Sequence, residues 1–197
     1  MASKEERRQE LVEIARDVFL RFGFRKTTLD DLANAMGMTK SSLYHYFESK
    51  EEWFRAAVWS IQDENIEVWA DVLFGSDTLL ESLHGMLESA KERLQLFEPH
   101  FADFFFEVQA FLPIIKDILE KQNKKFHDII VKRLLYAVEQ GEYDEMPAEE
   151  VADMLQLVLH HSLELHRNDH KLCLLDGGAS RYFELLLSPY KKHVIHK

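Results

Sequence analysis

Apolar side chains recur every three or four residues along most of the chain. This period places them on one face of an α-helix. The first such segment runs from Lys4 to Phe22, and Gly23 follows it at the position where a helix commonly ends in the left-handed conformation. No segment shows a sustained two-residue alternation rich in β-branched residues. The pattern predicts an all-α protein with about nine helices.

Two short helices separated by a tight turn are predicted next. Thr28 can cap the first, with Asp31 as the reciprocal residue, and Gly37 ends it after about two turns. Thr39 can cap the second, along which Leu43 and later apolar residues recur. Two such helices flanked by longer ones form a helix-turn-helix over residues 28–47, whose second helix enters the DNA major groove.

The exposed tips of this motif suit a nucleic acid. Side chains in the first turn of the second short helix can reach base edges, and those farther along can reach phosphate oxygens. The two capping threonines place hydroxyl and N–H groups at helix N-termini, which attract phosphate. The predicted DNA-binding residues are Thr28, Thr39, Lys40, Ser41, Ser42, Tyr44, His45, Tyr46 and Lys50.

Longer helices are predicted for the rest of the chain. A capping box of Ser49 and Glu52 starts a helix over about residues 50–74. Further helices are predicted from about 77 to 97, from 100 to 111, from 114 to a stop at Gly141, and from Pro147 to about 167. The last begins near Gly178 and includes the segment RYFELLLSPYKKH.

Charge is distributed unevenly along the chain, whose formal net charge is −11. Residues 1–50 carry nine Lys and Arg against eight Asp and Glu, whereas the remainder carries fifteen against twenty-seven. A polyanion is therefore expected to approach only the first part of the chain.

Several classes of protein are disfavoured by the composition. The single cysteine, Cys173, excludes an intrachain disulfide framework and a cysteine-based zinc cluster. The charged N-terminal residues do not form a secretory signal, and no apolar run approaches the length of about 20 residues that spans a bilayer. We expect a cytoplasmic protein with no membrane segment and no cofactor. No nucleophile–base set or glycine-rich phosphate loop indicates an enzyme.

An aromatic-rich segment between Phe97 and Phe111 holds six of the 14 phenylalanines. These rings pack as ordinary core, or they wall an apolar cavity that binds a small hydrophobic molecule. The candidate ligand-binding residues are Trp69, His84, Phe101, Phe104, Phe105, Phe106 and His160.

The last two predicted helices are apolar on more than one face, and such helices need cover on more than one side. The pair is either interior to a monomer or forms a four-helix interface across a twofold axis. The apolar residues are Val151, Met154, Leu155, Leu157, Val158, Leu159 and Leu163 in the first helix, and Tyr182, Phe183, Leu185, Leu186 and Leu187 in the second.

The segment TTLDDLANAMGMTKSSLYHYFESKEEWF, with LVEIARDVFLRFGFRKTT from Leu11 before it, resembles the N-terminal signature of the TetR family of bacterial transcriptional regulators. The matching positions are Thr28, Leu32, Ala33, Gly37, Thr39, Tyr44, Phe47, Lys50 and Trp53. Ser41 departs from the pattern, because many members have glycine there.

The resemblance implies a non-enzymatic repressor with a DNA-binding domain over residues 1–50 and a ligand-binding and dimerisation domain over 51–197. It implies a homodimer that binds a palindromic operator on double-stranded DNA and is released by a small hydrophobic effector. Two other hypotheses remain open. One is a helical-bundle metalloprotein that uses His160, His161 and Glu164. The other is a protein-interaction module that does not use its helix-turn-helix on DNA.

Overall fold

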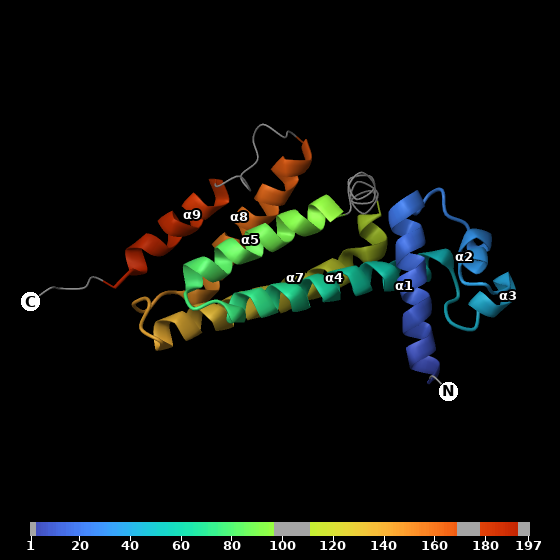
Figure 1. Cartoon of the computed structure of the whole chain (residues 1–197), viewed down its shortest axis with the longest axis horizontal. Coiled ribbons are helices and arrows are strands. Elements are labelled where there is room, and N and C mark those ends of the chain that lie inside the picture. Colours follow the sequence, from blue (N-terminus) through green and yellow to red (C-terminus); the bar gives the residue numbers. More distant parts are fainter. Residues whose placement is uncertain (1–2, 97–110, 169–177, 193–197) are drawn as a thin grey trace, which may run out of the picture. The chain divides into compact units, whose positions relative to one another are not determined.

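A computed structural model of the chain describes residues 3–96, 111–168 and 178–192, without the side chains of residues 93–96 and 161–168. Eight α-helices lie within this part and confirm the predicted all-α fold; the helix predicted for residues 100–111 falls outside the described residues. The helices are α1 (Lys4–Phe22), α2 (Leu29–Ala35), α3 (Lys40–Leu43), α4 (Lys50–Gly75), α5 (Leu79–Leu96), α7 (Leu112–Glu139), α8 (Ala148–Asn168) and α9 (Gly178–Leu187) (Figure 1).

The chain divides into two compact units. The first comprises residues 1–65 and 96–122, and the second comprises 66–95 and 123–197. Helices α4 and α7 contribute residues to both units. Each unit has its own cluster of buried apolar side chains.

The core of the first unit is largely aromatic. The Phe24 ring lies 4.7 Å from Phe54 and 4.5 Å from Phe111, measured between centroids. Trp53 is fully buried, and its ring lies 4.5 Å from Phe47. Helix α1 contacts α2, and α2 contacts α3. Residues of α2 and α3 are buried in this core, so the core supports the helix-turn-helix.

The start of α7 also belongs to this core, since Ile115 and Ile118 are buried in it. An ion pair fastens the same region: Arg55 of α4 meets the Asp117 carboxylate at 2.8 and 2.6 Å. The compact unit therefore extends beyond residue 50, the predicted end of the DNA-binding domain. The functional assignment of the two domains remains a prediction.

The second unit packs α5, α8, α9 and parts of α4 and α7 around buried leucines and Phe183. Arg133 of α7 is 1% exposed within it, and its Nε–H donates to the Leu73 carbonyl at 2.8 Å and to the Ser82 hydroxyl at 3.2 Å. Glu142 lies 3.5 Å from the same guanidinium and accepts from the Leu79 N–H at 2.7 Å. This buried group ties the end of α4 and the start of α5 to α7.

The last helix is shorter than predicted. It ends at Leu187, and a 3₁₀ turn over Ser188–Tyr190 follows. Pro189 has no N–H for the next helical hydrogen bond, so the segment after it leaves the helix. Within the described residues, no helix is long and apolar enough to cross a lipid bilayer.

Candidate DNA-binding surface and ligand cavity

The turn of the helix-turn-helix is made by Gly37. Its φ is +63°, a left-handed conformation that glycine adopts without steric cost. The N–H of Met38 then donates to the Ala33 carbonyl at 2.9 Å, which closes the end of α2. The predicted turn is thus present, and it presents α3 as a separate short helix (Figure 1).

The start of α3 carries a cluster of hydroxyl groups. The Thr39 Oγ1 accepts from the Ser42 N–H at 3.2 Å, which confirms the predicted cap. The same oxygen lies 2.9 Å from the Ser41 hydroxyl and 2.8 Å from the Ser42 hydroxyl. Thr39 and Ser41 are exposed and Ser42 is partly buried. These hydrogen bonds orient the three hydroxyl groups within the protein itself.

Lys40, the first residue of α3, makes a contact that the sequence pattern did not reveal. Its Nζ lies 2.9 Å from a carboxylate oxygen of Asp30 in α2. Both side chains remain about half exposed or more, at 47% and 66%. The hydrogen bond with Asp30 and its charge raise the pKa of the Lys40 ammonium. Lys40 is therefore charged and oriented at the front of α3.

The start of α2 is acidic. Thr28 and Asp31 form the predicted capping box, in which the Asp31 carboxylate accepts from the Thr28 N–H at 2.8 Å and from its hydroxyl at 2.7 Å. These hydrogen bonds from Thr28 lower the pKa of Asp31. With Asp30 beside it, the first turn of α2 carries two carboxylates and leaves the Thr28 hydroxyl engaged within the protein.

The aromatic residues after α3 divide between surface and core. Tyr44 is 50% exposed and His45 is exposed. Tyr46 is partly buried against the core, while Leu43 and Phe47 are buried. The buried pair anchors the segment, and Tyr44 and His45 are left facing outward.

Lys50 has partners different from the predicted phosphate. Its Nζ donates to the backbone carbonyls of Phe24 at 2.9 Å and Thr27 at 3.0 Å, and lies 4.2 Å from the centroid of the Phe24 ring. The lysine thus joins the start of α4 to the connector between α1 and α2. These contacts hold the connector that precedes the helix-turn-helix.

Arg8 of α1 was not among the predicted residues. Its guanidinium lies 4.4 Å from the centroid of the Phe47 ring and forms an exposed ion pair with Glu5 at 3.3 Å. A cation–π contact of this kind places a positive charge beside the segment that follows α3. The contact joins residues 39 positions apart, so helical periodicity could not have revealed it.

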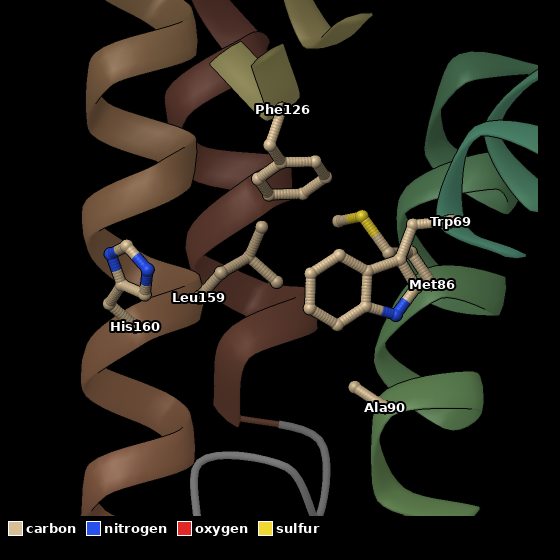
Figure 2. A pocket seen from close by; sticks show the side chains of 6 residues that line it. All are labelled: Trp69, Met86, Ala90, Phe126, Leu159 and His160. Atoms are coloured by element: carbon tan, nitrogen blue, oxygen red, sulfur yellow. The ribbon is translucent and has the colours of Figure 1, made fainter. Parts of the chain in front are cut away.

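A small cavity lies in the second unit (Figure 2). Its volume is about 30 Å³, and it is lined by Trp69, Met86, Ala90, Phe126, Leu159 and His160. Trp69, Met86 and Ala90 lie on one side, with Leu159 and His160 opposite. The rings of Trp69 and Phe126 are 5.0 Å apart.

Two predicted ligand residues, Trp69 and His160, thus meet at one cavity. His84 is partly buried on α5, and neither its Nε2 nor the Trp69 Nε1 has a hydrogen-bond partner among the described residues. The four predicted phenylalanines, Phe101, Phe104, Phe105 and Phe106, lie outside the described residues.

The metalloprotein hypothesis gains no support. The described residues contain no group of three or more His, Cys, Asp and Glu side chains that could hold a metal ion. The side chains of His161 and Glu164 fall outside that description.

Helices α8 and α9 contact each other, and among their described side chains each helix buries one face. Large apolar side chains remain exposed on both: Met154 at 53% and Leu157 at 69% on α8, and Tyr182 at 48% and Leu185 at 59% on α9. The members of each pair are three residues apart, so they share a helix face.

The sequence is similar to those of known transcriptional regulators. Residues 11–57 match the model of the bacterial regulatory proteins of the tetR family. The HTH-type transcriptional repressor KstR2 of Mycobacterium tuberculosis is 29% identical over 136 residues, covering 68% of this chain and 68% of the repressor.

Solved structures of transcriptional regulators share the fold of this chain. The ketosteroid transcriptional regulator KstR2 of Mycobacterium tuberculosis superposes with a TM-score of 0.56 at 25% identity, covering 95% of this chain and 96% of that one. A TetR-family transcriptional regulator from Cytophaga hutchinsonii shares the fold with a TM-score of 0.76 at 20% identity, covering 98% and 99%. The segment that holds the helix-turn-helix therefore matches the TetR family of bacterial transcriptional regulators, and the fold of the chain is shared with solved regulators of that family.

Proposed function

We propose that the chain is a repressor that binds a palindromic operator as a homodimer and is released by a small hydrophobic effector. The observation that carries the DNA-binding part is the outward-facing front of α3. Lys40 and the hydroxyls of Thr39, Ser41 and Ser42 are held there by short hydrogen bonds while Leu43 is buried behind them. This is the edge that a recognition helix presents to base pairs.

The proposed contacts follow from exposure. Lys40, Ser41 and Ser42 face base edges, and Tyr44 and His45 reach phosphate oxygens farther along. Tyr46 and Lys50 act by holding the segment in place, because their side chains pack on or bond to the first unit. Operator DNA lies in the cytoplasm, where such a regulator works.

The homodimer is supported by the exposed apolar face of α8 and α9. Four large apolar side chains there are 48% to 69% exposed. A second copy covers this face across a twofold axis and makes a four-helix interface. Two recognition helices related by that axis match half-sites about one DNA turn apart, which is why the operator is proposed to be palindromic.

The effector is proposed to bind at the cavity around Trp69. The lining is apolar apart from the His160 imidazole and the indole N–H, which suits a hydrophobic molecule with few polar groups. The volume of about 30 Å³ is far below the ~300–1,000 Å³ of pockets that hold drug-sized ligands. An effector must therefore favour a conformation with a larger cavity, and this preference shifts the population away from the DNA-binding form.

The DNA-binding proposal is tested by selecting duplexes from a randomised pool with the purified protein. The expected result is an enriched sequence with twofold symmetry, bound with a salt slope of about 0.9 per phosphate contact. Binding that is insensitive to salt, or a pool with no enriched sequence, would contradict it.

The effector proposal is tested by filling the cavity. Ala90→Val adds two methyl groups to the lining and is expected to abolish release by an effector found in a screen of hydrophobic compounds, ketosteroids among them. Operator binding without effector should persist, since Ala90 lies in the second unit. Release of the variant at the same effector concentration as the parent would place the effector elsewhere.

A further inference from the structure

The Asp30–Lys40 pair joins the two helices of the motif at the surface proposed to meet DNA. The carboxylate belongs to the first turn of α2 and the ammonium to the first residue of α3, ten positions later. At 2.9 Å the contact is a charge-assisted hydrogen bond. Both groups are exposed, so DNA that reaches one of them also reaches the other.

The pair restricts a side chain that is otherwise flexible. A lysine side chain has four rotatable bonds, and its ammonium has three N–H donors. Ordering this side chain costs up to about 2 kcal/mol of rotamer entropy. The Asp30 carboxylate accepts one of the three N–H groups of Lys40. The other two can donate to acceptors on a base edge. The ordering is then done before DNA binds, which favours the sequence that offers acceptors in the right place.

The pair also cancels charge. A free lysine attracts any phosphate, and this attraction supports binding to DNA of every sequence. With the Asp30 carboxylate beside it, the net charge at this position is near zero. Random DNA then gains little from Lys40, whereas a base with well-placed acceptors still gains hydrogen bonds.

We propose that Asp30 is a positioning residue for Lys40 and thereby determines how strongly the protein prefers its operator over other DNA. This inference rests on the proposed placement of α3 in the major groove. Asp31 does not share the role, because its carboxylate is bound to Thr28.

The test compares Asp30→Asn in the parent and in a Lys40→Ala background. Each protein is titrated with the duplex that the parent selects from a randomised pool and with a shuffled duplex of the same composition. Glu48→Gln is the matched control, since it removes an exposed carboxylate from the segment that follows α3. Thermal unfolding shows whether all variants fold alike.

The expected result is that Asp30→Asn lowers the ratio of selected to shuffled affinity by roughly fivefold, the low end for one good base contact. Its salt slope on the shuffled duplex should steepen by about 0.9, because the freed lysine gains a phosphate. In the Lys40→Ala background, Asp30→Asn should change both affinities by one factor and leave the ratio unchanged. Glu48→Gln should also leave the ratio unchanged.

Two results would overturn the inference. One is an unchanged ratio for Asp30→Asn in the parent; the other is an equal fall in the ratio when Lys40 is absent. Either leaves the proposed function intact, because the parent still selects an operator. A parent that selects no sequence at all rejects the proposed function and this inference together.

Discussion

Lys50 shows how the partners of a single side chain change the meaning of its substitution. Its ammonium donates to two backbone carbonyls and lies over the Phe24 ring. Lys40, by contrast, has one exposed partner. Lys40 in the helix-turn-helix and Lys50 at the start of α4 therefore have different roles, one at the exposed surface and one in the stability of the first unit.

Lys50→Ala is expected to lower the free energy of unfolding by about 1–3 kcal/mol, because two partly buried carbonyls lose a charged donor. Lys40→Ala, the matched control, should change it by less than about 1 kcal/mol, as exposed ion pairs do. Urea titration followed by circular dichroism measures both. Unchanged stability of Lys50→Ala together with weaker DNA binding would mean that the lysine reaches a phosphate instead.

The Asp31 carboxylate makes the start of α2 sensitive to acid. Hydrogen bonds from Thr28 lower its pKa in the folded protein below the ordinary value. The ionised cap therefore stabilises the fold above about pH 4, and this contribution is lost as the pH falls through the folded pKa. Urea unfolding of the parent and Asp31→Asn is expected to differ near neutral pH and to converge in acid. A difference that does not vary with pH would rule out the ionised cap as its source.

At the scale of elements, the short helices α2 and α3 depend on their ends more than on their length. Helices of seven and four residues are too short to be stable alone. Capping at Thr28 and Thr39 and the left-handed turn at Gly37 compensate, together with the packing of α2 on α1 and of α3 on α2. The turn that separates α2 from α3 therefore depends on the positive φ of Gly37.

Gly37→Ala is expected to lower stability by about 1 kcal/mol, since alanine is strained at a φ of +63°. No atom lies within 4 Å of an added Cβ, so the cost is in the backbone alone. Gly75→Ala is the control: it too has nothing within 4 Å, but its φ is not positive. It should be neutral or slightly stabilising. Thermal unfolding distinguishes the two, and equal effects would contradict the role of the turn.

For the whole molecule, the question is what covers the outer face of α8 and α9. Exposed apolar side chains occur singly on most proteins, but two pairs on adjacent helices mark an interaction surface. The inner faces of these helices already fill the core of the second unit. The proposed homodimer would cover these outer faces without further partners.

Leu157→Glu is expected to convert the proposed dimer to a monomer, because the buried charge would lack a partner in the interface. Leu135→Glu on α7 is the matched control, since Leu135 is also exposed, at 53%, but lies on another helix. It should leave the dimer intact. Sedimentation equilibrium measures both masses. A dimer that survives Leu157→Glu would place the interface on a different surface.

The sequence alone determined the features whose causes lie within a few residues of one another. The helix from Lys4 to Phe22, the Thr28–Asp31 capping box, the turn at Gly37 and the cap at Thr39 all follow from local spacing, and the structure confirms them. Such features depend on backbone geometry over one or two turns, which the order of residues specifies directly.

Only the tertiary structure decided the contacts between residues far apart in the chain. It brought Asp30 to Lys40, placed Lys50 on the carbonyls of Phe24 and Thr27, and packed Ile115 into the core behind the helix-turn-helix. Periodicity shows that a face is apolar, but it does not say which other face will cover it. Which face covers it depends on how all the elements pack together, because burial against any apolar surface is similarly favourable.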